Sequence, residues 1–388
     1  MFAASDISQM LQRKLMSNSL QELTRWGPFG RLVTWWRGGG KEQRRSERAA
    51  PRKSKSTRED FVKNALEIAT TVEAGGNAEK MHRTSYKLLR LDLYERAWEL
   101  RTRAAELDQP TPIPEWDGSD LAGLSVLVRA YTPRDRVGEE LRLARFIAPV
   151  AKQARRCIVL AEPRLVPLLQ RSFDGIEVRP RGIDEAAAFA EADVAAYYET
   201  IALYTVKTAE DMKRSFVSLR GAPERVGALR QRYGARAPLI GLSWTSKNTD
   251  KVLPDLKDWE PLLAWAPATF VTLQYGDIKR DVERMQEFTG GRVIHDPEID
   301  QWTDLDGYAA QIAALDAVVS ISNTTIDMAG MLGVPTVHIR DDNLSSAIWP
   351  RSGPSPWYPD MIFLYRERRP WSEVFAEART RLEQLISK

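Results

Sequence analysis

The chain is poor in the residues that build metal centres and covalent cross-links. Its 388 residues include one cysteine, Cys157, and only three histidines. These numbers exclude a disulfide framework and leave too few ligands for a cysteine–histidine metal cluster. No apolar run approaches the ~20 residues that span a bilayer, and the N-terminus lacks the basic-then-apolar order of a signal peptide. We therefore expect no metal site, a buried thiol at Cys157 and a cytoplasmic protein.

Net charge is also low. Lys and Arg number 56 against 53 Asp and Glu, which leaves +3, so the balance does not favour nucleic-acid binding. Hydrophobic residues make up 43% of the chain, a globular composition. The length leaves room for two domains and an appendage.

Residues 1–58 differ in composition from the rest. Residues 7–26 have the spacing of an amphipathic helix, and 41–58 are basic and poor in apolar residues, as in a disordered linker. A Trp-rich amphipathic segment beside a basic run is typical of a peripheral contact with a membrane, here the inner membrane. The alternative is a helix packed on the body of the protein or on a second copy, in a homo-oligomer.

The remaining sequence predicts three segments. Residues 59–110 have helical periodicity without a clean repeat, so they are at most a degenerate tetratricopeptide-like segment. In 111–235 and again in 236–388, short apolar runs alternate with helical patterns, which predicts two doubly wound parallel sheets. The fold class is therefore α/β, and ligands of such sheets bind at the carboxyl ends of the strands, here at a cleft between the two domains.

The stretch 317–339 suggests where a ligand binds. It reads as a strand over 317–321, a polar turn, a short helix, and a second strand after Pro335. A helix that starts at the carboxyl end of a parallel strand offers N–H groups and partial positive charge to an anion. An ordinary strand-to-helix turn with a polar cap is the alternative. The residues that could cap the helix or bind the anion are Ser322, Asn323, Thr324 and Thr325.

This stretch resembles the sugar-nucleotide half of the heptosyltransferase-like glycosyltransferases of family 9 and their tetratricopeptide-linked relatives. Four further segments follow the family's order, at 240–248, 269–277, 304–320 and 355–359. The match is strong for the C-terminal half and weaker for the N-terminal half. The family residues that this chain keeps in the stretch are Asn323, Thr324, Ala329, Gly330, Leu332, Gly333 and Pro335.

The resemblance implies a GT-B glycosyltransferase of glycan biosynthesis. Such an enzyme moves a hexose or heptose from a nucleotide-diphosphate donor to a glycan, lipid or protein hydroxyl, with inversion and without a cofactor or metal. Lys247, which follows the strand at 239–244, is the candidate cation for the leaving phosphate, and a solvated loop lysine is the alternative. The other residues expected at the nucleotide are Thr245, Ser246, Gln274, Tyr275, Ser322, Asn323, Thr324, Thr325 and Asp327.

Two positions depart from the family pattern. Glu139 stands where the family has its catalytic-type Asp, so it is the candidate base, although it could also be a first-turn carboxylate favoured by the helix dipole. Asp327 stands where most members have His, and it must turn away, pair with Lys247 or contact a hydroxyl if it is not to repel a diphosphate. These departures leave open an inactive sugar-nucleotide-binding or scaffold protein of the same fold. A purely helical adaptor would not explain the α/β sequence.

Overall fold

The structure is a computed structural model that describes residues 57–131, 137–234, 237–247, 251–341, 348 and 354–386. By its contacts the chain divides into two units, 1–64 and 65–388, and the fold described below is that of the second. The expected amphipathic helix at 7–26 and nearly all of the basic linker at 41–58 lie outside the described residues. None of the described helices combines the length and the apolar character needed to cross a membrane.

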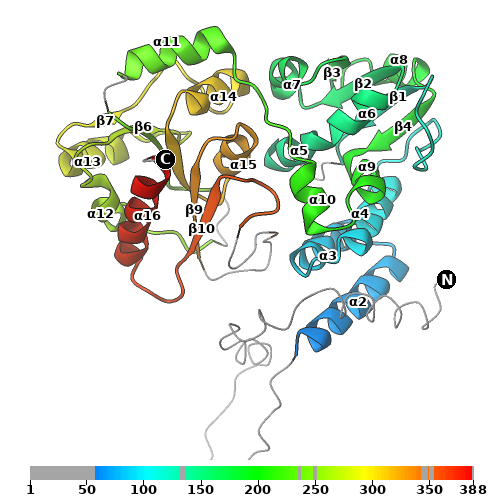
Figure 1. The fold of residues 1–388 in the computed structure, drawn as a ribbon, viewed down its shortest axis with the longest axis horizontal. Coiled ribbons are helices and arrows are strands. Elements are labelled where there is room, and N and C mark those ends of the chain that lie inside the picture. Colours follow the sequence, from blue (N-terminus) through cyan, green and yellow to red (C-terminus); the bar gives the residue numbers. More distant parts are fainter. Residues whose placement is uncertain are drawn as a thin grey trace, which may run out of the picture. The chain divides into compact units, whose positions relative to one another are not determined.

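The first sheet is parallel and four-stranded, in the order β3-β2-β1-β4 (Figure 1). Its two inner strands are apolar and buried because both of their faces are covered. The register aligns Val128 with Val159 on one side and with Ala196 on the other. The strands are β1 (Ser125–Arg129), β2 (Arg156–Ala161), β3 (Ile176–Pro180) and β4 (Val194–Tyr197).

Helices follow each strand of this sheet. The segment 137–153 forms two helices, α5 and α6, with a 3₁₀ turn between them at Ala144–Phe146. Cys157 is buried in β2, as expected. The helices and 3₁₀ turns of this part are α5 (Val137–Leu143), α6 (Ile147–Gln153), η3 (Pro163–Leu165), α7 (Val166–Ser172), α8 (Glu185–Ala190) and α9 (Tyr198–Thr205).

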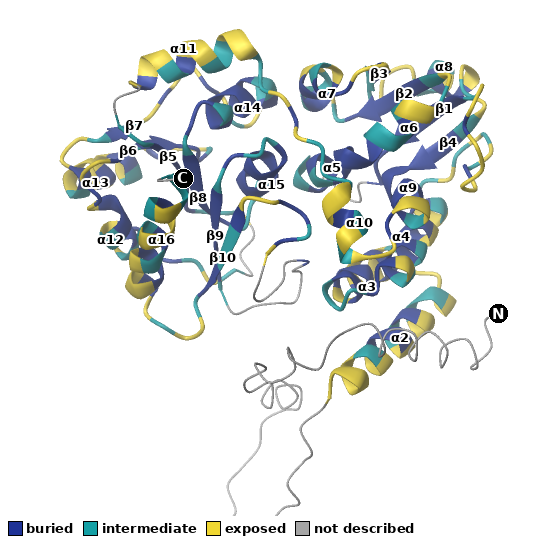
Figure 2. Cartoon of the chain, in the orientation of Figure 1, coloured by how far each residue is buried: buried dark blue, intermediate teal, exposed yellow. Residues whose placement is uncertain are grey.

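The second sheet is parallel and six-stranded, in the order β10-β9-β8-β5-β6-β7. Figure 2 shows its central strands as buried, and they share one large hydrophobic core with the helices that pack on the sheet. The strands are β5 (Leu239–Ser243), β6 (Thr269–Thr272), β7 (Val293–Ile294), β8 (Ala317–Ile321), β9 (Thr336–Arg340) and β10 (Met361–Tyr365). Its helices are η4 (Leu256–Trp259), α12 (Glu260–Leu263), α13 (Lys279–Thr289), α14 (Leu305–Ala313), α15 (Thr324–Met331) and α16 (Trp371–Ile386).

Further helices precede and connect the sheets. The segment 209–233 forms two helices, α10 (Ala209–Arg214) and α11 (Pro223–Tyr233). Helix α2 (Arg58–Ala74) is followed by α3 (Ala78–Arg90) and α4 (Tyr94–Asp108), which pack on each other. Helix α4 also packs on α9, so part of the expected helical segment lies directly against the first sheet's helices. The predicted α/β class with parallel sheets is confirmed.

Helix α15 packs closely against the ring of Tyr358, and the residue at the point of contact is Gly330. A β-carbon at Gly330 would lie 2.6 Å from the ring of Tyr358, which is buried. Alanine normally stabilises a helix interior relative to glycine by ~1 kcal/mol. The ring of Tyr358 cannot yield easily because its hydroxyl is bonded to Asp327.

Gly330→Ala should therefore lower the free energy of unfolding, by about 1–3 kcal/mol as in overpacked cores. Gly227→Ala is the matched control, because Gly227 lies in α11 and nothing lies within 4 Å of the added carbon; it should stabilise by up to ~1 kcal/mol. Denaturant unfolding of both variants measures the difference. Equal effects of the same sign would contradict the packing of α15 described here.

Candidate functional site

The carboxyl ends of β5, β6 and β8 meet at a polar corner where α15 begins. Asn323 caps α15 by accepting from the Thr325 N–H at 3.1 Å, as the sequence predicted for this turn. Its amide nitrogen donates to Ser243 Oγ at 2.7 Å, which ties the end of β8 to the end of β5. The first turn of α15 is therefore fixed against the sheet edge, where helix N-termini attract anions.

Two basic side chains converge on Ser322, at this corner. Lys251 Nζ donates to the Ser322 carbonyl and, at 3.1 Å, to Ser246 Oγ. Arg340, the last residue of β9, donates to Ser322 Oγ at 2.9 Å. The same hydroxyl lies 2.7 Å from Nε2 of His338. We call Ser246, Lys251, Ser322, Asn323 and Arg340 the cationic corner.

The electrostatics of the cationic corner are set by burial and by the proximity of its basic groups to one another. Burial, with Arg340 nearby, lowers the pKa of Lys251, and burial lowers the pKa of Arg340. Burial together with these two cations holds the pKa of His338 well below its usual value, so the ring is neutral. Asp341 opposes the lowering at both basic groups. An anion bound here would stabilise the charged forms of Lys251 and Arg340.

Two residues predicted to contact a nucleotide lie behind the corner instead. Gln274 is fully buried, and its Oε1 accepts from Ser243 Oγ and from the N–H groups of Trp244 and Thr245. Thr325 is buried, with its hydroxyl 2.7 Å from that of Tyr308. These two side chains hold the strand ends together, so the expectation of direct contact is corrected.

Lys247 does not lie with the cationic corner. Its side chain is exposed, and its ammonium stands 4.1 Å from the ring centroid of Trp302 and 5.5 Å from that of Tyr275. The backbone N–H of Lys247 also lies 3.4 Å from the Tyr275 hydroxyl. The lysine that reaches Ser322 is Lys251, four residues further on, and a phosphate contact by Lys247 stays a prediction.

Asp327 is neutralised by residues of α5 and of the segment before β10. Arg142 of α5 holds it with two hydrogen bonds, at 2.9 and 3.2 Å, and the Tyr358 hydroxyl donates at 2.8 Å. Helices α5 and α15 touch so closely that a β-carbon at Gly138 would lie 2.8 Å from Asp327 Oδ2. Of the alternatives open for Asp327, the structure shows a paired carboxylate, and its partners are Arg142 and Tyr358 and not Lys247.

Glu139 lies in a buried cluster of charges. Its side chain accepts from the Tyr86 hydroxyl at 2.9 Å and from Arg101 at 2.5 Å, and its second oxygen lies 3.2 Å from His82. Arg101 also donates to Glu199 at 3.0 Å. Burial alone would raise the pKa of Glu139, but His82 and Arg101 outweigh it and hold that pKa well below the usual value. A carboxylate of this kind is a weak proton acceptor, and its 4% exposure shields it from an acceptor hydroxyl.

Sequence reasoning missed the residues that the fold brings in from a distance. Lys251 and Arg340 carry the positive charge of the corner, and the available signal was their position after β5 and at the end of β9. Arg101 and His82 had no motif to mark them. The Thr324 hydroxyl makes no hydrogen bond within the described chain, so it remains available at the corner. Among the described residues no group of His, Cys, Asp and Glu could hold a metal ion.

Comparisons with known proteins support this architecture. The solved glycosyl transferase family 9 protein of Veillonella parvula is 12% identical, covers 69% of this chain with 99% of its own length, and has a TM-score of 0.52. The ADP-heptose lipopolysaccharide heptosyltransferase II of Escherichia coli is 13% identical over 67% of this chain and 99% of its own, with a TM-score of 0.48. Together with the two parallel sheets, the first likeness defines the chain as a GT-B-like fold, as the sequence predicted.

One curated relative matches the chain in sequence. Protein FlbA of Caulobacter vibrioides is 28% identical over 318 residues, which are 75% of this chain and 52% of the relative. The chain thus spans about half the length of that relative. No protein-family model matches the chain.

Glu139 and Glu199 both contact Arg101, but the loss of the charge of each carboxylate should affect the stability of the fold differently. The pKa of Glu199 is raised, because burial and the charge of Glu139 outweigh the attraction of Arg101. The lowered pKa of Glu139 contributes stability that is fully present above the unfolded value, ~4.3, and is lost as pH falls through the folded value. The raised pKa of Glu199 has the opposite sign, so its ionisation weakens the fold as pH rises.

Glu139→Gln should therefore lower the free energy of unfolding at pH 7 by on the order of 3 kcal/mol, as when a buried pair loses one partner. Glu199→Gln should change it by only about 1 kcal/mol. Thermal unfolding of both variants between pH 5 and 8 makes the comparison. A larger loss for Glu199→Gln than for Glu139→Gln would show that Arg101 is compensated by Glu199 instead.

Proposed function

We propose that this protein is a glycosyltransferase that binds a nucleotide-diphosphate sugar with its diphosphate at the cationic corner. The observation that carries the proposal is the convergence of Lys251 and Arg340 on Ser322, beside the N-terminus of α15. Both cations are largely buried and have lowered pKa values, so an anion would relieve their mutual repulsion. The GT-B-like fold and the resemblance of 317–339 to family 9 support the same substrate class.

The proposed reaction is a displacement at the anomeric carbon of the donor sugar. The acceptor oxygen forms the new bond and its proton passes to the base, proposed to be Glu139, while the bond from sugar to phosphate breaks and the nucleoside diphosphate leaves with the electron pair. Lys251, Arg340 and the amides of α15 would stabilise the growing negative charge of the leaving group. Inversion, a hexosyl or heptosyl donor, and a glycan, lipid or protein acceptor are parts of this proposal, as is a cytoplasmic location.

A second candidate function is donor binding without transfer. It is favoured by Glu139, whose carboxylate is held by Arg101 and His82 with a low pKa. As a base, Glu139 would have to leave these partners when the acceptor binds. Glu139 thus remains the proposed base on the strength of its position, and turnover decides between the two functions.

The test is a screen of ADP-, GDP- and UDP-sugars. Thermal stabilisation reports binding to the folded state, and release of nucleoside diphosphate, with and without candidate acceptors, reports transfer or hydrolysis. Stabilisation with turnover supports the transferase. Stabilisation without turnover by any donor supports the binding protein, and no stabilisation by any of them would refute both.

Lys251→Met should weaken nucleoside-diphosphate binding by on the order of 10- to 100-fold, the equivalent of ~1.5–3 kcal/mol for a hydrogen bond to a charged group. Lys257→Met is the matched control, because Lys257 is exposed in η4, and it should bind as the unmodified protein does. Isothermal titration measures both. If Lys251→Met binds the nucleoside diphosphate as tightly as the unmodified protein, the diphosphate does not bind at the cationic corner.

A further inference from the structure

An aromatic surface lies beside the cationic corner. Trp302 is 51% exposed, and its ring packs at a tilt against that of Tyr275, with the centroids 5.5 Å apart. Lys247 covers the Trp302 ring at 4.1 Å, and the Arg164 guanidinium stands 5.6 Å from its centroid. We call Tyr275 and Trp302 the aromatic platform. A tryptophan this exposed loses the stability that burial would give it.

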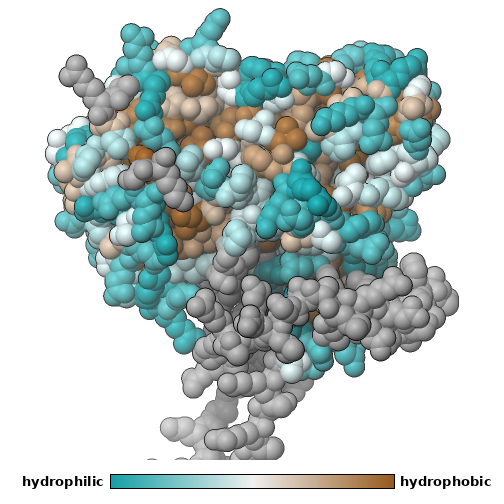
Figure 3. All heavy atoms as spheres, in the orientation of Figure 1, coloured by the Kyte–Doolittle hydropathy of each residue, from teal (hydrophilic) through white to brown (hydrophobic). Residues whose placement is uncertain are grey.

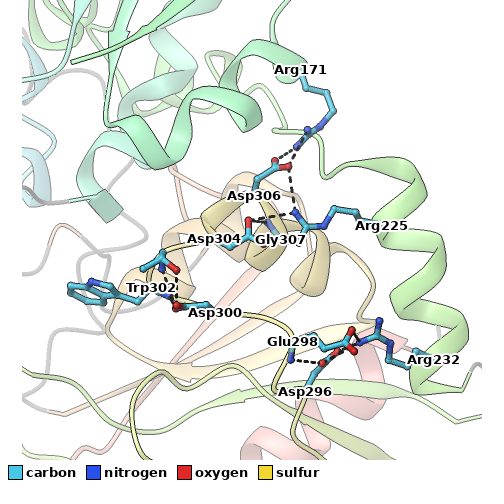
Figure 4. Close-up of polar contacts among 11 residues, drawn as sticks. Arg171, Arg225, Arg232, Asp296, Glu298, Asp300, Trp302, Asp304, Asp306 and Gly307 are labelled. Carbon is cyan, nitrogen blue, oxygen red and sulfur yellow. Dashed lines mark hydrogen bonds and ion pairs between the residues drawn. The ribbon is translucent and has the colours of Figure 1, made fainter. Parts of the chain in front are cut away.

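The chain holds the platform in place. Asp300 accepts from the backbone N–H groups of Trp302 and Thr303 at 2.8 and 3.0 Å, and Arg164 donates to the Trp302 carbonyl at 2.7 Å. Figure 4 shows the Trp302 ring directed away from the ion pairs that fasten the start of α14, where Asp304 and Asp306 meet Arg225 and Arg171. The ring is exposed on a tethered segment, so a ligand would not have to order it.

The platform is joined to the cationic corner through two short connections. Tyr275 follows Gln274, which binds the backbone of Thr245 beside the corner. Lys247 follows Ser246, which is part of the corner. Past Tyr275, a hollow of about 600 Å³ opens at Gly276 and extends to His295. On the other side of the corner, the backbone of α5 at Gly138 lies against Thr324.

Resting on the proposed function, we infer that the nucleobase of the donor stacks on Trp302 and Tyr275, which directs the sugar toward α5. A base has a flat π-face, and aromatic side chains stack on bases without regard to their sequence. The Lys247 ammonium occupies the ring by an exposed cation–π contact, which is weaker than base stacking. A base would displace Lys247 and release it toward the diphosphate, the role that its sequence position predicted.

The surface of the molecule is mixed in hydropathy. Hydrophilic and apolar side chains are interspersed over the face drawn in Figure 3, as expected of an ordinary protein surface. Exposed aromatic rings under two cations are a more specific feature than surface hydrophobicity. They match a ligand that carries a planar base next to negative charge.

The test compares two ligands, a nucleoside diphosphate identified by the donor screen and inorganic pyrophosphate, on three variants. Trp302→Ala should weaken binding of the nucleoside diphosphate roughly 5- to 100-fold and leave pyrophosphate binding unchanged. Trp302→Phe should recover most of the affinity. Tyr204→Ala, which removes a comparably exposed aromatic of α9, is the control and should bind both ligands normally.

The outcomes separate this inference from the proposed function. If Trp302→Ala binds the nucleoside diphosphate normally while Lys251→Met does not, the corner stands and the platform is refuted. A third outcome is that Trp302→Ala weakens binding of the sugar donor but not of the nucleoside diphosphate. The ring would then contact the sugar, and the inferred orientation of the donor would be reversed. If Trp302→Ala weakens pyrophosphate equally, the loop and not stacking is responsible, which also overturns the inference.

Discussion

The ion pair between Arg142 and Asp327 is the contact on which the candidate site depends. It joins α5, which belongs to the first sheet, to α15, which belongs to the second. The contact requires Gly138, since any larger residue would meet Asp327. It also gives Asp327 a cationic partner of its own, although the charge of Asp327 still raises the pKa of Lys251 against the effect of burial. Without Arg142, a carboxylate in the first turn of α15 would oppose any anion bound at that helix end.

Charge is distributed unevenly around this contact. On the α5 side, Glu139 and Glu199 share Arg101, and His82 lies beside Glu139, so the acidic groups have nearby basic partners. At the corner, Lys251 and Arg340 both bond to Ser322. Burial lowers the pKa of both, and the charge of Arg340 lowers that of Lys251 further. Low dielectric strengthens the attraction between opposite charges in the first cluster and the repulsion between like charges in the second. The first cluster places acidic groups beside its cations, whereas the second brings two cations to one serine beside the start of α15, which is why the corner and not Glu139 carries the functional proposal.

The sequence predicted the elements well and the side-chain partners poorly. Apolar runs such as 317–321 and 336–339 are buried strands because parallel sheets cover both faces, and Asn323 caps α15 as its residue type suggested. The break at Ala144–Phe146 was hidden because apolar spacing continues through it. Periodicity reports which face is buried, and it does not report how a turn is wound.

The choice between Lys247 and Lys251 shows why partners are harder to predict. Both follow β5, and spacing alone favoured the nearer residue. The structure selects Lys251 because its ammonium reaches the Ser322 carbonyl, 71 residues away in sequence. In the same way, Glu139 was placed correctly at the start of a helix, but its surroundings come from Arg101, 38 residues earlier, and from His82. Contacts at such separations leave no local pattern.

The burial of Glu139 gives helices α3 and α4 a structural role in the body of the protein. Helices α3 and α4 supply His82, Tyr86 and Arg101, all of which contact the carboxylate at the start of α5. Removing these helices would leave Glu139 and Glu199 buried without their cation, which folded proteins rarely tolerate. The segment resembling a tetratricopeptide remnant is therefore part of the body that positions α5. Because α5 also carries Arg142, the same helices bear on the charge of Asp327 and, through it, on the cationic corner.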